Sequence, residues 1–184
     1  MSNPDHRRKP GMSLPITRDE MLTRIARFND HNPDLAAFPD LKSEGFKREV
    51  RYMLSTDSMA GPAQITAPHN FHMAILTMPP GMKPVVHAHP YNEIFMPIDA
   101  SFRYYWGDDA GENMENSAEL SPMDVISVPA GVHRTFENLT DHDAHVVAIF
   151  DIAGDPHTDM VVPQEVYERF YADGWVPGVE AKGD

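Results

Sequence analysis

Residues 81–100 read GMKPVVHAHPYNEIFMPIDA, with histidines at positions 87 and 89 and a glutamate at position 93. Side chains alternate between the two faces of a strand, so His87, His89 and Glu93 share a face and can converge on one interior point. Two imidazoles and one carboxylate suit Fe(II), Mn(II), Ni(II) or Zn(II) and leave coordination positions open for water, substrate or dioxygen. The stretch therefore predicts an interior metal site; the alternative is a surface histidine pair beside a solvated carboxylate.

Short apolar runs rich in Val, Ile, Phe and Tyr surround this stretch, and turns containing proline and glycine separate them. Such runs are typical of β-strands. Breaks such as Pro79-Pro80-Gly81 and Pro129-Ala130-Gly131 recur at intervals typical of an antiparallel sandwich or barrel. The sequence therefore predicts an all-β fold, with strands at residues 46–54, 71–78, 85–89, 94–98, 102–106, 125–128 and 146–152.

Two helices are predicted outside the strands. Thr17 can cap a helix over residues 17–29, with Glu20 reaching back, and apolar residues at helical spacing predict that this helix packs on a larger body. A shorter helix is predicted over residues 163–173, with proline in its first turn. The predicted organisation is a flexible tail (1–16), a helix and irregular connection (17–45), the barrel (46–152), and a C-terminal helix and tail (153–184).

Composition excludes several classes of protein. The 15 basic and 28 acidic residues give a net charge of −13, which argues against nucleic acid and anionic membranes as partners. The absence of cysteine excludes disulfides, thiolate zinc sites and iron–sulfur clusters. We find no export signal and no apolar run long enough to span a membrane, so a cytoplasmic location is expected.

The stretch around His87 resembles the first motif of the cupins, Gly-x5-His-x-His-x3–4-Glu-x6-Gly, with Ala100 in place of the last glycine. The second cupin motif, with Gly-Asp, Pro-x-Gly-x-x-His and Asn, is matched by the segment from Met123-Asp124 to Asn138. The resemblance covers about residues 46–152. It implies a double-stranded β-helix, the jelly-roll barrel, with a helix packed outside, a metal in the barrel mouth, and a homodimer.

The second motif departs from the family at the fourth metal ligand, where this chain has Arg134. The resemblance then implies a three-ligand site in which Arg134 holds a substrate carboxylate or enolate oxygen. His133, one position earlier, is the alternative fourth ligand; otherwise His133 faces solvent and Arg134 pairs with Glu137 or Asp124. His72, on a predicted strand, is a candidate proton shuttle or substrate contact, with a core histidine as the alternative.

These features favour a metal-dependent enzyme acting on a small oxygen-bearing organic substrate. Oxygenase chemistry with Fe(II) is the leading interpretation, with Mn, Ni or Zn as alternative metals. A non-redox lyase or isomerase, in which His72 or His133 moves a proton, is the second interpretation. The third is a small-molecule binding module without turnover, because fold does not fix function.

Overall fold

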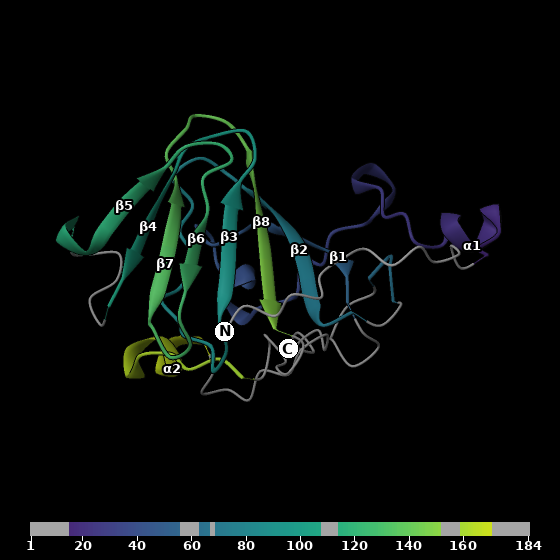
Figure 1. Ribbon diagram of the computed structural model, residues 1–184. Helices are drawn as coiled ribbons and strands as arrows, with labels where there is room; N and C mark the ends of the chain where they lie inside the picture. Colours follow the sequence, from purple (N-terminus) through teal and green to yellow (C-terminus); the bar gives the residue numbers. More distant parts are fainter. Residues whose placement is uncertain (1–14, 56–62, 67–68, 108–113, 152–158, 171–184) are drawn as a thin grey trace, which may run out of the picture.

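The computed structural model describes residues 15–55, 63–66, 69–107, 114–151 and 159–170 (Figure 1). Two antiparallel sheets face each other. The larger sheet contains, in spatial order, β1 (Glu49–Leu54), β2 (Phe71–Met78), β8 (Ala144–Asp151), β3 (Glu93–Pro97) and β6 (Ile126–Val128). The smaller sheet contains β5 (Ser117–Leu120), β4 (Phe102–Trp106) and β7 (Arg134–Asn138). The all-β jelly-roll prediction is confirmed.

The core lies between the sheets, because each strand buries alternate side chains. On β2, Ala74, Leu76 and Met78 are buried while the residues between them are partly exposed. On the opposite sheet, the rings of Tyr104 and Phe136 stack with centroids 5.2 Å apart. Alternation of apolar residues therefore determines which side chains fill the barrel.

The segment 85–89 was predicted as a strand and is not one. His87 exchanges backbone hydrogen bonds with Arg134 (3.2 and 2.9 Å), whereas Ala88 exchanges them with Val161 (2.7 and 2.9 Å). The backbone thus forms two isolated bridges to different partners instead of one continuous ladder. Prolines at positions 84 and 90 cannot donate backbone hydrogen bonds and confine the pairing to these few residues. The prediction also missed β5 and β7.

The N-terminal helix is shorter than predicted. Its capping box is present, since Thr17 and Glu20 exchange hydrogen bonds of 2.7 and 3.2 Å, but α1 spans only Arg18–Leu22. Met21 and Ile25 are 48% and 43% exposed, so the predicted packing is wrong. A short helix without a buried apolar face gains little stability, which explains why it ends early.

The remaining helical segments are short. Single turns of 3-10 helix lie at Phe28–Asp30 (η1), Pro39–Lys42 (η2) and Met114–Asn116 (η3). The C-terminal helix α2 spans Gln164–Phe170, inside the predicted range. The end of that range, at residues 171–173, and most of the predicted tail at 1–16 lie outside the described residues.

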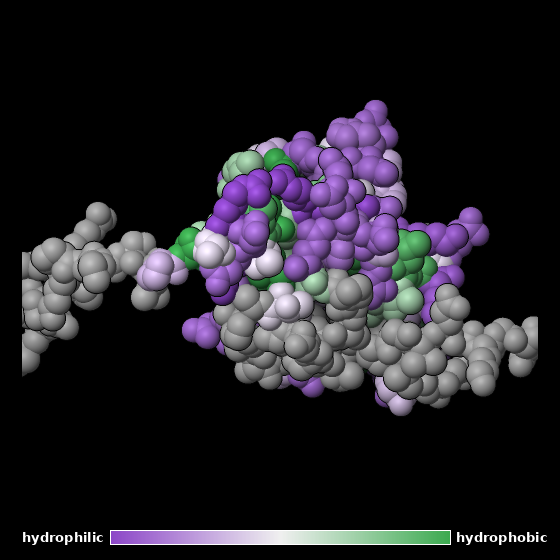
Figure 2. All heavy atoms as spheres, turned by 90° about the vertical axis from the view of Figure 1, so that its right-hand side faces the viewer, coloured by the Kyte–Doolittle hydropathy of each residue, from purple (hydrophilic) through white to green (hydrophobic). Residues whose placement is uncertain are grey.

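The surface in Figure 2 is mostly hydrophilic, with small apolar areas, as expected for a chain with a large excess of acidic side chains. In the part of the chain that the structure describes, no helix has the length and apolar character needed to cross a membrane.

Asn138 holds together the loops at one end of the barrel. Its Nδ2 donates to the carbonyl oxygens of Met78 and His142, both at 2.8 Å, and its Oδ1 accepts from the backbone and hydroxyl of Thr140. We expect Asn138→Ala to lower the free energy of unfolding by about 2–3 kcal/mol, because it removes the donor to the buried Met78 carbonyl and to the partly buried His142 carbonyl. Urea denaturation would measure this. The exposed Asn92, whose Oδ1 accepts one backbone hydrogen bond, offers a control: a loss no larger than that of Asn92→Ala would contradict the prediction.

Candidate metal and substrate site

The candidate site lies at one end of the barrel, at the bottom in Figure 1. Glu93 is the first residue of β3, Arg134 is the first of β7, and Phe150 lies next to the last residue of β8. Glu93 and His72 both pair with Phe150 in the larger sheet, so the three form one row across it. Polar side chains therefore lie buried among apolar ones at this end of the barrel.

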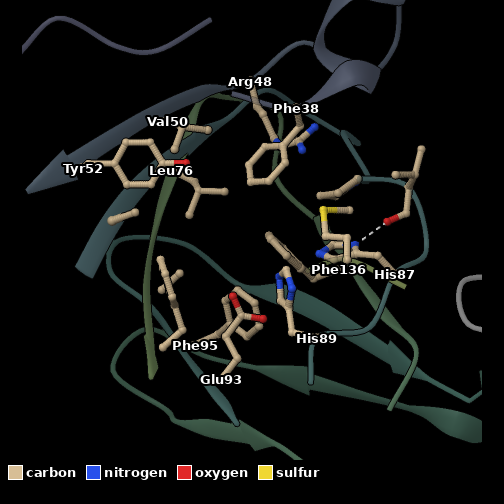
Figure 3. Close-up of a pocket in the computed structure, with 16 residues that line it drawn as sticks. Phe38, Arg48, Val50, Tyr52, Leu76, His87, His89, Glu93, Phe95 and Phe136 are labelled. Carbon is tan, nitrogen blue, oxygen red and sulfur yellow. Dashed lines mark hydrogen bonds between the residues drawn. The ribbon is translucent and has the colours of Figure 1, made fainter. Parts of the chain in front are cut away.

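A cavity of about 40 Å³ opens beside these residues, which is room for roughly three water molecules (Figure 3). His87, His89 and Glu93 line it and are 8%, 4% and 6% exposed. Three residues predicted from spacing therefore border one buried cavity. Its remaining walls are mainly apolar and are formed by Phe38, Val50, Tyr52, Ala74, Leu76, Pro84, Val85, Phe95, Phe136, Ala148, Phe150 and Met160, together with Arg48.

His87 is held in a defined orientation. Its Nδ1 lies 2.7 Å from the carbonyl oxygen of Val85, and because a carbonyl can only accept, Nδ1 carries the proton. Burial, followed by the nearby charge of Arg134, holds the pKa of His87 well below its usual value. The imidazole is therefore neutral and presents the Nε2 lone pair, which is the form that binds metals.

His89 is positioned by ring contacts. Its imidazole stacks on Tyr91 with centroids 4.9 Å apart and an angle of 11° between the planes. The rings of His87 and His89 meet edge to face at 5.3 Å. The two imidazoles thus lie side by side at the same wall of the cavity (Figure 3).

Glu93 forms a buried ion pair with Arg134. Nη2 of Arg134 donates to Oε2 of Glu93, and Nη1 donates to the carbonyl oxygen of His87 at 2.8 Å. Burial raises the pKa of Glu93, and the guanidinium opposes this change by favouring the charged carboxylate. Arg134 pairs with neither Glu137 nor Asp124, the partners considered from the sequence: Glu137 accepts from Tyr105, and Asp124 accepts from the backbone of Ser121.

The side chains of His87, His89 and Glu93 are of the chemical types that bind divalent metals, because they combine imidazole with a carboxylate. In the structure, however, Glu93 is bound to Arg134. Within the described ranges, no group of three or more His, Asp or Glu residues is arranged to hold a metal ion. His87 therefore presents Nε2 toward a metal as it stands, with His89 beside it, and Glu93 would join them once Arg134 releases its carboxylate.

Two other predicted site residues do not line this cavity. His133 is half-buried and directly precedes Arg134, whose side chain occupies the interior. His72 is 1% exposed, with its Nδ1 3.0 Å from Oγ of Ser55 and its ring stacked on Phe150 at 5.2 Å. Phe150 lies between His72 and Glu93 in the row across the sheet.

Sequence reasoning missed a second buried ion pair at this site. Arg48, just before β1, lines the cavity, and both ends of its guanidinium donate to Asp40, at 2.9 and 3.2 Å. Asp40 also accepts from the backbone of Val85 at 3.3 Å, and Val85 in turn orients His87. The sequence offered one indication of this pair. Arg48 lies two and four residues before Val50 and Tyr52, and alternation along extended backbone places all three on the same inward face.

No protein-family model and no curated protein matches the sequence. Among solved structures, the chain is similar to the Lactobacillus farciminis oxalate decarboxylase in its formate complex, with 15% identity, a TM-score of 0.53, and coverage of 77% of this chain and 36% of that one. It is also similar to a sugar phosphate isomerase of the cupin superfamily from Silicibacter pomeroyi, with 14% identity, a TM-score of 0.51, and coverage of 69% of this chain and 74% of that one. A cupin 2 domain-containing protein from Halorhodospira halophila is similar as well, with 12% identity, a TM-score of 0.51, and coverage of 69% of this chain and 78% of that one.

Some of the matched chains are much longer than the part that this chain covers. The chain spans about a third of the decarboxylase and 53% of a chain from a structure of DMSP lyases. At such identities the comparisons show architecture only. Together with the two facing sheets and the buried HAH segment at the barrel end, they establish that the chain has the cupin fold.

Proposed function

We propose that the chain is a metal-dependent cupin enzyme acting on a small oxygen-bearing organic molecule, with oxygenase chemistry as the leading reaction. The observation that carries this proposal is the position of His87, His89 and Glu93 along one wall of a buried and otherwise mainly apolar cavity. Burying ionisable side chains is costly even when they are paired, so three such groups at one cavity wall favour a functional role over a purely structural one.

A divalent metal such as Fe(II) at this wall would supply open coordination positions for substrate oxygens and dioxygen. The protein supports that chemistry in two ways. The Val85 carbonyl fixes the tautomer of His87 and so keeps Nε2 available. The rings of Phe95, Phe136 and Phe150 exclude bulk water, which strengthens electrostatic interactions inside the cavity.

Arg134 is held by hydrogen bonds to two groups of the site. Two of its donors are engaged by Glu93 and by the His87 carbonyl, which fixes the orientation of the Glu93 carboxylate and links β7 to the HAH segment. We propose that Arg134 is first the counter-ion of Glu93, with which a metal would have to compete for the carboxylate. The donor now held by Glu93 would become available to a substrate oxyanion after that ion pair separates.

The lyase or isomerase alternative was based on proton transfer by His72 or His133. His72 and His133, the residues proposed to move a proton, are absent from the cavity lining. The similar structures include an oxalate decarboxylase and a sugar phosphate isomerase, and so do not select one reaction.

Metal analysis of the purified protein and of His87→Ala tests the proposal. We expect near-stoichiometric Fe, Mn, Ni or Zn in the wild type and a loss of at least tenfold in the variant. His142→Ala is the matched control, because the side chain of His142 is exposed and contacts the neighbouring Asp141. Equal metal content in wild type and His87→Ala, or no metal in either after reconstitution, would overturn the metal site.

Dioxygen uptake then tests the reaction. We expect the iron-loaded protein to consume dioxygen with a member of a panel of small diketones and of 2-oxo and 2-hydroxy acids, and His87→Ala to consume none. Conversion of a panel compound without dioxygen uptake would instead support the non-redox alternative. The predicted homodimer would be measured on the same samples by light scattering.

A further inference from the structure

Arg48 faces the candidate metal ligands across the cavity. It shares the inward face of its segment with Val50 and Tyr52, and its side chain is 4% exposed. Figure 3 shows Arg48 and Phe38 on the side of the cavity opposite His89 and Glu93, and the guanidinium carbon lies 5.2 Å from the centre of the Phe38 ring. The cavity thus has ligand-type residues at one wall and a cationic side chain at the other.

Among the described residues, the hydrogen bonds of Arg48 use one edge of its guanidinium and leave Nε, on the other edge, without an acceptor. Nη1 donates to Asp40 and to the carbonyl oxygen of Phe46 (3.1 Å), and Nη2 donates once, to Asp40. Nε has no hydrogen-bond partner among the residues that the structure describes. Nε and the second hydrogen of Nη2 point along the same edge, and two parallel donors of this kind match the two oxygens of a carboxylate.

The charges around the cavity also favour an anion. Arg48 is balanced by Asp40 and Arg134 by Glu93, so the two buried pairs cancel. A divalent metal at His87 and His89 would then add two positive charges to a mainly apolar cavity. An uncompensated buried charge is strongly unfavourable, and a bound organic anion would offset it.

We propose that the Nε–Nη2 edge of Arg48 binds the carboxylate of a small organic acid whose other end lies against His87 and His89. The cavity of about 40 Å³ limits the ligand to a few non-hydrogen atoms. This inference rests on the proposed function for the orientation of the acid, but the carboxylate contact with Arg48 does not require a metal.

Acetate binding tests the assignment. We expect [1-¹³C]acetate, titrated at constant ionic strength and followed by NMR, to bind the zinc-loaded wild type and to bind Arg48→Lys at least tenfold more weakly. Lysine keeps a positive charge beside Asp40 but lacks the two parallel donors. Arg51→Lys is the matched control, because Arg51 lies on β1 and contacts Glu49 and Thr77 rather than the cavity; its acetate affinity should stay within twofold of the wild type.

Zinc affinity, measured on the same variants, separates this inference from the proposed function. Zinc binding retained in Arg48→Lys with acetate affinity unchanged would overturn the role of Arg48 and leave the metal site standing. Acetate binding to metal-free wild type that Arg48→Lys weakens, without zinc binding in either protein, would support Arg48 and overturn the metal site.

Absence of acetate binding in the wild type, with and without zinc, would overturn the inference. If Arg48→Lys is not folded by circular dichroism, the neutral double variant Asp40→Asn/Arg48→Met replaces it, because it removes the donors without leaving a buried charge. Loss of acetate binding in the folded double variant would support the inference, and retention would overturn it.

Discussion

Replacing Arg134 with glutamine is expected to raise the affinity of the metal-free protein for Zn²⁺ at least tenfold. In the structure, Oε2 of Glu93 is bound to Arg134, so a metal must compete with this guanidinium for the carboxylate. Glutamine removes the competing cation and also leaves the buried carboxylate without a counter-charge. Removing one partner of a buried ion pair costs about 3–5 kcal/mol, and a bound metal ion would recover much of that loss.

Calorimetric titration of zinc into the apo proteins measures this effect, and thermal denaturation with and without zinc gives the linked change in stability. Arg103→Gln is the matched control, because Arg103 pairs with Glu119 on the surface and lies on β4 away from the cavity lining. An Arg134→Gln variant that is folded and binds zinc no more tightly than Arg103→Gln would show that Arg134 does not compete for Glu93.

The parts of the site that could be predicted from sequence are those that local spacing controls. Alternation of side chains along extended backbone was enough to bring His87, His89 and Glu93 to one cavity wall, even though the segment makes isolated bridges instead of a strand. The apolar runs likewise located most strands, because strand burial repeats every second residue. The β7 strand was missed since Arg134, Thr135 and Asn138 are buried polar residues that interrupt such a pattern.

The two ion pairs could not be predicted, because each depends on tertiary structure. Arg134 reaches Glu93 across 41 residues of sequence, through the bridge between its own backbone and His87. Asp40 lies in a single 3-10 turn of a segment with no apolar period, so nothing local showed that its carboxylate is 0% exposed. The prediction of a helix over 17–29 was wrong for the opposite reason. The capping residues and the apolar spacing favour a helix, but the described residues provide no surface that buries its apolar side chains.

Asp40→Asn is expected to lower the free energy of unfolding by about 3–5 kcal/mol. The change removes the charge that neutralises Arg48, whose side chain is 4% exposed, and weakens the acceptor for the backbone of Val85. Glu49→Gln is the matched control, because Glu49 pairs with Arg51 at the surface with 41% of its side chain exposed, and such pairs contribute about 0–1 kcal/mol. Urea denaturation followed by tryptophan fluorescence measures both variants.

The double variant Asp40→Asn/Arg48→Met then separates the two contributions of this pair. Removing both charges should restore most of the stability lost in Asp40→Asn, because a neutral pair of similar volume leaves no uncompensated charge. A loss in Asp40→Asn no larger than in Glu49→Gln would show that the pair does not stabilise the fold. If the double variant recovers stability but not acetate binding, the charge on Arg48 serves the ligand, and the buried Asp40 is what allows the fold to keep that charge inside the barrel.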